Sequence, residues 1–541
     1  MPEALTPRAA EALLRPLDNS ATTLTAMLEY LHETGRGANI IGDGGATVTG
    51  ICLDSRAVQP GDLYVAAPGA RFHGAQFAQA ALQAGAAAIL TDIEGEAAAS
   101  ALGLPVLLVD QVREVIGELS ALVYGTDEAC PELFGLTGTN GKTTTSYMIR
   151  SVLRALGRET GLVGTIEIAA GQTPIPSILT TPEAPQLHGL MARMRELGVA
   201  AATMEVSSHS LSYRRVDGLR FAVSGFTNLT QDHLDLHGSM QEYFDTKALL
   251  FDLERSDRAV ITVDDAWGRK MAAQATAEVW TLASDPATDA DWVIDNVVPA
   301  GLGHRFQLRG PEEIVLELGT GLPGDFNVSN AALAVLMVLA SGVDPDRLQE
   351  ALNEANPLTV EVPGRMQVIA EAPASIVDFA HNPDALARAL ASVRSAEPGS
   401  RVIVVFGATG ERDATKRPIM GAVAARHADV VIVTDDDPHS EDPAPIRAAV
   451  AAGARAEIQA QGLRTEVREI HPRAAAIAAA VALAGERDTI LVAGRGHEVF
   501  QEVMGENLEL DDREELRRAL LAHGFSPLSA VSDSFDPTDE G

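Results

Sequence analysis

The sequence contains few cysteines, few aromatic residues and no surplus of positive charge. Two of its 541 residues are cysteines, Cys52 and Cys130, and two are too few for a disulfide framework or a cysteine-ligated zinc site. A reducing cytosol is therefore the simplest setting, and we expect both cysteines to be small buried side chains. Aromatic residues make up 4% of the chain against 46% for all hydrophobic residues, which is typical of a soluble α/β protein rich in helices.

Positive charge is the scarcer sign, because 41 lysines and arginines stand against 75 aspartates and glutamates, a formal net charge of −34. Nucleic acid or an acidic membrane surface would be repelled by this charge, so we expect neither as a partner. Small anionic ligands remain possible where positive charge is concentrated locally.

Long hydrophobic runs are also missing. The longest, residues 474–484, is shorter than the roughly 20 residues that cross a membrane. The first residues include Glu3, Glu11 and Asp18 rather than an apolar core, so we expect neither a targeting segment nor a transmembrane helix.

The length predicts about three or four domains at roughly 150 residues each. In residues 1–130, short apolar stretches at 51–53, 63–66, 88–90 and 106–109 alternate with alanine-rich helical segments, which indicates a small α/β domain. In residues 131–358, strands at 202–206, 222–226 and 259–263 are separated by helix-length segments, which favours a mainly parallel sheet.

A third domain is predicted over residues 359–530, with strands at 375–379, 402–406, 430–433 and 489–492 in a doubly wound, Rossmann-like pattern. The stretch 356–364, which contains Pro357 and Pro363, resists helix formation and is suited to a hinge between the second and third domains. The acidic tail 531–541 has little to bury, and we expect it to be disordered.

The most informative motif is GTNGKTTT, residues 138–145, which follows an apolar strand and opens a helical pattern. Gly138 and Gly141 allow backbone N–H groups to approach phosphate oxygens, Lys142 can reach the outer phosphates, and the Thr143 hydroxyl can complete a magnesium shell. Leu136 replaces the first glycine of the longer Walker A pattern. The motif predicts ATP binding and cleavage, although a glycine-rich turn that happens to carry a lysine would look similar.

Two further polar segments follow strands whose ends should lie at the same sheet edge. Glu205 ends the strand at 202–206, where it is a candidate magnesium ligand or, alternatively, a helix-capping carboxylate. The loop TNLTQDHLDLH supplies possible metal ligands, although such residues are often only turn formers or surface groups. These candidates are Asp232, His233, Asp235 and His237.

Nine motifs in order resemble the Mur ligase family, and within it the tripeptide-forming MurE type, over nearly the whole chain. They are LTGTNGKTTT, MEVSSHS, FTNLTQDHLDLHGSMQEYFDTKALLF, GDFNVSNAALA, VPGRM, VDFAHNPDAL, FGATGERDATKRPIMG, TDDDPHSEDP and VAGRGHE. The resemblance implies an N-terminal UDP-binding domain, a central ATPase domain and a C-terminal Rossmann-like domain. It also implies a cytoplasmic enzyme of peptidoglycan synthesis, and we expect a monomer. Its reaction joins an L-amino acid to the D-glutamate of UDP-N-acetylmuramoyl-L-alanyl-D-glutamate, with ATP cleaved to ADP and phosphate.

The resemblance also assigns residues around ATP. Those implied to bind the nucleotide are Gly138, Thr139, Asn140, Gly141, Lys142, Thr143, Thr144, Asn330, Arg365, Asp378 and His381, with Asn327 and Lys416 beside them. Lys142 is implied to be catalytic, together with the ligands of two Mg²⁺ ions. Thr143 and Glu205 are expected to hold the first ion, and His233 and Lys247 the second. Lys247 would act as a carbamate formed with carbon dioxide, whereas without the resemblance it would be taken for an exposed helix lysine.

Two substrates complete the implied site. The contacts expected for the UDP-muramoyl dipeptide are Leu53, Ser55, Thr180, Thr181, Ser207 and Arg215, and those for the incoming amino acid are Arg412, Asp436, Asp437, Pro438, His439, Gly494 and Glu498. Arg412 matches the family contact to the α-carboxylate and Glu498 the contact to the amine. Tyr213 and residues 70–72 depart from the polar residues that some relatives carry.

The loop at 436–439 bears on which amino acid is added. Relatives that take meso-diaminopimelate usually have D-N-P-R there, whereas this chain has Asp436, Asp437, Pro438 and His439. Without the arginine, a distal carboxylate loses an ion pair worth about 1.5–3 kcal/mol, and it also meets repulsion from the added carboxylate of Asp437, whereas a distal ammonium would be favoured. We therefore predict L-lysine, then L-ornithine, then meso-diaminopimelate. The alternative is that the loop only caps a strand and that His439 still accepts the acid.

Three other functions fit part of the sequence. A folylpolyglutamate synthetase would share the ATPase and C-terminal motifs, but it lacks an N-terminal domain with the LDSR segment seen at 53–56. Another Mur ligase would share the ATPase motifs without the TDDDP and GRGHE segments. A regulatory ATPase without ligase activity would release phosphate regardless of either substrate.

Overall fold

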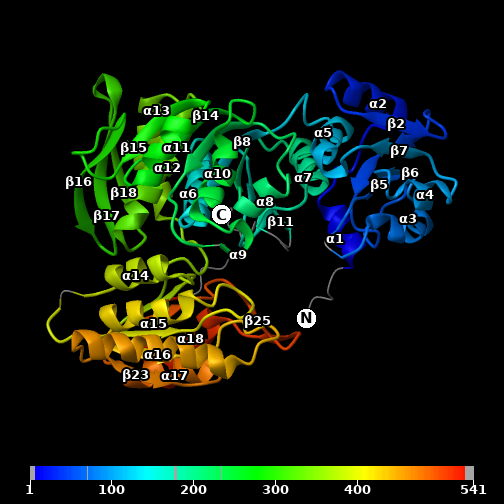
Figure 1. Ribbon diagram of the computed structural model, residues 1–541. Helices are drawn as coiled ribbons and strands as arrows, with labels where there is room; N and C mark the ends of the chain where they lie inside the picture. The colour runs from blue at the N-terminus through cyan, green and yellow to red at the C-terminus, as the bar shows by residue number, and fades with distance from the viewer. Residues whose placement is uncertain (1–5, 70, 176–179, 233, 396, 530–541) are drawn as a thin grey trace, which may run out of the picture.

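A computed structural model describes residues 6–69, 71–175, 180–232, 234–395 and 397–529 (Figure 1). Three regions are arranged around three main β-sheets, and the predicted tail at 531–541 and His233 lie outside the described residues. In Figure 1 the N-terminal region is blue, the central region cyan to green, and the C-terminal region yellow to red. Within the described ranges, no helix has both the length and the apolar character needed to span a membrane.

The N-terminal region is built on a sheet of order β2-β7-β6-β5-β4, in which only the edge strand β2 runs antiparallel. Its inner strands are fully buried because helices cover both faces, as expected for parallel strands. Cys52 is buried as expected, but Cys130 is exposed because it lies in the loop before the next region. The elements are α1 (Pro7–Leu13), β1 (Thr22–Thr23), α2 (Leu24–Glu33), β2 (Ala38–Ile41), β3 (Thr47–Val48), β4 (Gly50–Cys52), β5 (Asp62–Ala66), α3 (Ala78–Ala84), β6 (Ala88–Thr91), α4 (Glu96–Ser100), β7 (Val106–Val109) and α5 (Val112–Tyr124).

The central sheet has the order β11-β10-β9-β12-β8-β13-β14-β15-β16-β17-β18 in the described part of the chain. The strands β9, β12, β8, β13, β14, β15 and β16 are parallel to one another. Antiparallel pairing adds β10 and β11 at one end of the sheet and β17 and β18 at the other. The strands are β8 (Glu132–Thr137), β9 (Thr160–Val163), β10 (Ile168–Ala170), β11 (Thr173–Ile175), β12 (Ala201–Glu205), β13 (Phe221–Phe226), β14 (Ser256–Thr262), β15 (Glu278–Ala283), β16 (Trp292–Ala300), β17 (Gly303–Arg309) and β18 (Val315–Thr320).

Helices cover both faces of the central sheet, and two separate hydrophobic clusters are buried between the helices and the strands. The helix α12 is apolar nearly all round, so it is enclosed between α6 and the strands rather than lying at the surface. The expected hinge contains a short 3₁₀ turn, Pro357–Thr359, so the prediction that this stretch resists helix was wrong at its start. The helices are α6 (Lys142–Ala155), α7 (Ala184–Glu196), α8 (Ser208–Ser212), α9 (Leu234–His237), α10 (Met240–Ala248), α11 (Ala266–Gln274), α12 (Asp325–Ala340) and α13 (Pro345–Ala355).

The C-terminal region has a sheet of order β19-β20-β24-β21-β22-β23, parallel except at β19, with helices on both faces. A separate hairpin, β25–β26, follows the last parallel strand. The elements are β19 (Gln367–Glu371), β20 (Ala374–Asp378), α14 (Pro383–Ser392), β21 (Val402–Phe406), α15 (Lys416–His427), β22 (Val430–Val433), α16 (Pro443–Gln461), β23 (Glu466–Glu469), α17 (Arg473–Leu483), β24 (Thr489–Ala493), β25 (Phe500–Val503), β26 (Glu506–Glu509) and α18 (Asp512–Ala522).

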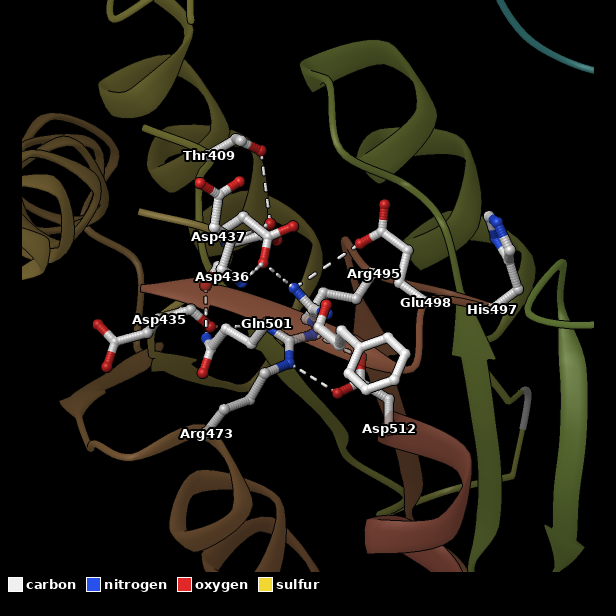
Figure 2. A network of polar contacts seen from close by, with 12 residues as sticks. Thr409, Asp435, Asp436, Asp437, Arg473, Arg495, His497, Glu498, Gln501 and Asp512 are labelled. Carbon is white, nitrogen blue, oxygen red and sulfur yellow. Dashed lines mark hydrogen bonds and ion pairs between the residues drawn. The ribbon is translucent and has the colours of Figure 1, made fainter. Parts of the chain in front are cut away.

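A fully buried ion pair ties the C-terminal region together beneath the ends of its strands (Figure 2). The Arg473 guanidinium, at the start of α17, donates to both carboxylate oxygens of Asp512, at the start of α18, at 2.7 Å each. It also donates to the carbonyls of Asp435, after β22, and Ala493, at the end of β24, at 3.0 and 2.8 Å. One side chain thus joins two helices and two strand ends.

We expect Arg473→Met to lower the free energy of unfolding by about 3–5 kcal/mol, because it leaves the Asp512 carboxylate buried and unpaired. Chemical denaturation followed by circular dichroism measures the change. Arg518→Met is the matched control, because it breaks an i,i+3 pair with Glu515 on the same helix α18, from a side chain that is 72% exposed. Its cost should stay within about 0.5 kcal/mol. Equal losses for the two variants would contradict the role given to Arg473.

Candidate active site

A cavity of about 680 Å³ lies at the carboxyl edge of the central sheet and is closed on its other side by the C-terminal region. The central strands contribute three groups to it. These are the glycine-rich segment 138–145 after β8, called the phosphate loop below, Glu205 at the end of β12, and Thr227 after β13. The C-terminal region contributes Asp378 and Arg412, among others. The sequence-predicted residues that line the cavity are Thr139, Asn140, Gly141, Lys142, Thr143, Thr144, Thr180, Thr181, Glu205, Ser207, Arg215, Asp232, Asn327, Asn330, Arg365, Asp378, His381 and Arg412.

The phosphate loop folds as its glycines require. Gly138 and Gly141 have φ values of 143° and 91°, and a Cβ atom on Gly138 would collide with the Thr227 hydroxyl. The loop is held by its neighbour Asn228, whose carbonyl accepts from Thr139 N at 2.9 Å. The Lys142 ammonium folds back onto the loop and donates to the carbonyls of Gly138 and Thr139, both at 2.9 Å. The loop thus presents backbone N–H groups and a half-buried ammonium at the start of α6.

Glu205 meets the phosphate loop through Thr143. Its Oε2 accepts from the hydroxyls of Thr143 at 2.9 Å and Thr165 at 3.1 Å, and its Oε1 accepts from Thr165 N at 2.8 Å. The carboxylate is 1% exposed, so its orientation is fixed by these donors. A buried carboxylate and a hydroxyl therefore present oxygen atoms to one point beside the loop.

Lys247 is buried under the loop rather than exposed on its helix. The side chain from α10 is 1% exposed, with Nζ 2.9 Å from the Gly138 carbonyl, 3.3 Å from Thr137 Oγ1 and 4.7 Å from the centre of the Tyr243 ring. Among the described residues, the hydrogen-bond partners of Nζ are a hydroxyl and a carbonyl rather than a carboxylate. Burial lowers the pKa of Lys247 well below its usual value, and nearby Lys142 lowers it further. Burial thus favours the neutral amine more than it does for an exposed lysine.

The side of the cavity that the sequence predicts to bind the nucleotide combines α12 with the first residues of the C-terminal region. Asn330 donates to Asn327 Oδ1 at 3.0 Å, so the two predicted asparagines form one fixed pair. The Arg365 guanidinium stacks 4.1 Å from the centre of the Phe379 ring. Asp378 accepts from the backbone N–H groups of Met366 and Ala380 at 2.7 and 2.9 Å.

Direct contacts join the phosphate loop to the C-terminal helix α14. The Asn140 side-chain amide donates to Asp384 Oδ2 at 3.2 Å, and its oxygen accepts from Asn382 Nδ2 at 3.2 Å. His381 Nε2 lies 3.6 Å from the carboxylate of Asp232, which follows β13. The loop that would hold phosphate thus directly touches the region that closes the cavity.

The predicted dipeptide contacts divide between two places. Thr181 donates to the Glu205 carbonyl at 2.8 Å and lies 3.4 Å from Ser207 Oγ, while Arg215 donates to the Thr181 carbonyl at 3.1 Å. Leu53 and Ser55 follow β4 in the N-terminal region and do not line this cavity. The separation suits an extended ligand that spans two regions.

The residues predicted to contact the incoming amino acid also lie in two places, one at the cavity and six beside it. Arg412 is exposed at the cavity, and no hydrogen bond or ion pair of its side chain is found among the described residues. The other six do not line the cavity but form an adjacent cluster, to which the Arg412 loop is joined by a bond of 2.8 Å from Gly410 N to the Asp437 carbonyl. These six are Asp436, Asp437, Pro438, His439, Gly494 and Glu498.

Figure 2 shows that carboxylates outnumber cations in this cluster. The fully buried Arg495 guanidinium pairs with Asp437 and lies 3.7 Å from Glu498. Burial raises the pKa of Glu498 to about 8, and the Asp436 charge raises it as well. Burial favours a raised pKa for Asp436 too, but Arg473 and Arg495 hold it below its usual value. The cluster would therefore gain from a further positive charge.

Sequence reasoning missed several residues of this site. Thr165 carries no motif, and only its position after the parallel strand β9 could have indicated it. Asn228 lies in the FTNLT segment and Arg495 in GRGHE, so the family motifs contain both residues and could have indicated them. Lys416 begins α15 and does not line the cavity, so the structure does not bring it to the nucleotide side.

Comparisons with known proteins agree with this geometry. Family models match residues 47–124 (Mur ligase family, catalytic domain), 136–338 (Mur ligase middle domain) and 364–496 (Mur ligase, glutamate ligase domain). The chain is 43% identical over 519 residues to a UDP-N-acetylmuramyl-tripeptide synthetase of Leifsonia xyli, covering 95% of this chain and 99% of the relative. It is 44% identical over 508 residues to a UDP-N-acetylmuramoyl-L-alanyl-D-glutamate–2,6-diaminopimelate ligase of Streptomyces coelicolor, covering 94% and 98%.

A solved structure of a UDP-N-acetylmuramoyl-L-alanyl-D-glutamate–2,6-diaminopimelate ligase superimposes with a TM-score of 0.63 at 30% identity, covering 90% of this chain and 98% of that one. Sequence and structure thus agree over nearly the full length of both proteins. The chain belongs to the Mur ligase family.

Proposed function

We propose that this chain is an ATP-dependent ligase that adds an L-amino acid to the D-glutamate γ-carboxylate of UDP-N-acetylmuramoyl-L-alanyl-D-glutamate, in the cytoplasm and as a monomer. One observation carries the proposal: the phosphate loop and Glu205 line one cavity, Lys247 is buried directly beneath that loop, and the exposed Arg412 reaches the cavity from the opposite region. The similarity to the tripeptide synthetase over nearly the whole chain supports the same reaction.

The chemistry follows from the weakness of a carboxylate as an electrophile. ATP would transfer its γ-phosphoryl group to the carboxylate, and positive charge around the transferred group lowers the barrier. Lys142 is placed to supply that charge at the phosphate loop. The amine of the amino acid would then attack the acyl phosphate, and phosphate would leave as the amide forms.

The residues present fit magnesium. Thr143 Oγ1 and Glu205 Oε2 lie 2.9 Å apart, and Mg²⁺ prefers oxygen donors completed by water and substrate phosphates. Such outside ligands would be needed, because among the described residues no three His, Cys, Asp or Glu side chains could hold a metal. Bound ions would neutralise charge on the transferred phosphoryl group. We propose Thr143 and Glu205 for one ion, and His233 and carbamylated Lys247 for the other.

We expect Lys247→Ala to lower ligation by roughly a hundredfold or more, because the neutral buried amine that would take up carbon dioxide is lost. Added bicarbonate should not restore the rate. Phosphate release and product formation measure the effect, and Lys270→Ala is the control, a lysine over the rings of Phe244 and Trp267 on the exposed helix α11. Near wild-type turnover of the Lys247 variant would refute the carbamate assignment.

The contacts of Asn140 predict that phosphate binding and closure of the C-terminal region are coupled. Asp384→Ala removes one of them, and we expect kcat/KM for ATP to fall roughly 10–150-fold, the equivalent of about 1.5–3 kcal/mol for one hydrogen bond to a charged group. Small-angle scattering should show compaction of the wild type with an ATP analogue and the sugar nucleotide, and less in the variant.

Asp346→Ala is the matched control, because Pro345 and Asp346 start α13 as Pro383 and Asp384 start α14, but Asp346 does not touch the loop. Identical kinetics for both variants, with unchanged compaction, would rule out the coupling.

For the amino acid we propose L-lysine, then L-ornithine, with meso-diaminopimelate third. The supporting observation is the acidic excess of the cluster around Arg495 together with the absence of an arginine at position 439. One part of the sequence argument changes: Asp437 is paired with Arg495, so the excess belongs to the cluster and not to Asp437 alone. The relatives named for 2,6-diaminopimelate support the alternative.

We expect kcat/KM to be highest for lysine, with ornithine within roughly 10–200-fold because one methylene is worth about 1–3 kcal/mol. Amide formation with each of the three amino acids measures this order. Phosphate release without either substrate would favour a regulatory ATPase, and activity with a folate substrate a folylpolyglutamate synthetase. A preference for meso-diaminopimelate over lysine would overturn the assignment.

A further inference from the structure

The hairpin β25–β26 holds the amino-acid loop residue by residue. Gln501 Nε2 donates to the Asp436 carbonyl, and Glu502 N donates to Asp437 Oδ1 at 3.0 Å. His439 N donates to the Glu502 carbonyl at 3.2 Å, and the His439 carbonyl accepts from Met504 N at 2.7 Å. The hairpin therefore fixes where the loop residues lie.

The side chain of His439 is held by the same hairpin. Its backbone is in the left-handed region with φ of 52°, and its ring Nδ1 lies 2.7 Å from Glu502 Oε2. An ionised carboxylate can only accept, so the ring must carry its proton on Nδ1 to make this bond. The imidazole is thus committed to a carboxylate of the protein.

Apart from Arg412, which has no ion pair among the described residues and is expected to bind the α-carboxylate, the arginines around this pair are already engaged. In the described part of the chain, Arg495 forms ion pairs with Asp437 and Glu498, and Arg473 forms one with Asp512. Two more arginines of the neighbourhood are engaged in the same way, Arg447 by Asp435 and Glu469, and Arg417 by Glu441. The Glu502 side chain is 44% exposed, and among the described residues no arginine or lysine forms an ion pair with it.

Resting on the proposed function, we propose that Glu502 is a specificity-determining residue, which excludes amino acids with a distal carboxylate and favours those that end in an ammonium group. It acts in two ways. Its charge repels a distal carboxylate that approaches the loop, and its bond to His439 occupies Nδ1, so that this nitrogen cannot donate to that carboxylate. The residue lies outside the loop motif, which is why the motif alone does not reveal it.

Glu502→Gln tests the charge while it keeps an oxygen that can accept from His439 Nδ1. We expect the ratio of kcat/KM for lysine to that for meso-diaminopimelate to fall roughly tenfold or more, mainly through a lower KM for the acid. Glu502→Lys should lower the ratio further. Circular dichroism confirms that each variant is folded.

Glu506→Gln is the matched control, since it removes the same charge from β26 of the same hairpin without contacting His439. Its ratio should stay within about twofold of wild type. An unchanged ratio in both Glu502 variants, or an equal fall in the Glu506 variant, would overturn the proposal. A wild-type enzyme that ligates none of the amino acids would instead contradict the proposed function.

Discussion

The shared carboxyl edge of the central parallel strands is the constraint on which the rest of the structure depends. Because β8, β12 and β13 run in the same direction and are hydrogen-bonded side by side, their ends deliver the phosphate loop, Glu205 and Thr227 to one place. Helices cover both faces of this sheet, so the edge is where polar groups can gather without disrupting the core.

Burial then sets the chemistry of the charged groups at this edge. The chain as a whole is strongly acidic, yet Lys142, Lys247 and Arg365 are brought together in the cavity wall or beneath it. Removal from water lowers the pKa of both lysines, while Glu205 and Asp232 oppose the change at Lys142. Lys142 and Arg365 thus give a strongly acidic protein a local concentration of positive charge at this cavity.

In the C-terminal region the local charge has the opposite sign, because carboxylates are in excess at its strand ends. Buried guanidinium groups compensate for them: Arg473 fixes the framework through Asp512, and Arg495 occupies the centre of the amino-acid cluster. The hairpin β25–β26 joins this cluster to His439. The framework and the cluster that we propose to select the amino acid are therefore joined through a few ion pairs.

The sequence by itself determined the α/β class, the family and most of the buried strands. Those at Val106–Val109, Val402–Phe406 and Val430–Val433 were predicted to the residue, because continuous apolar runs flanked by turn residues leave little choice. It did not reveal the antiparallel strands β16 to β18, whose mixed polar pattern reflects exposure on one face. Motifs placed the phosphate loop and Arg412 at one cavity, which the structure describes. Only the tertiary structure decided that Lys247 is buried, that Asn140 touches α14, and that Asp437 and His439 are already paired with Arg495 and Glu502. These contacts join residues far apart in sequence, and their burial and charge balance exist only once the separate regions have packed together.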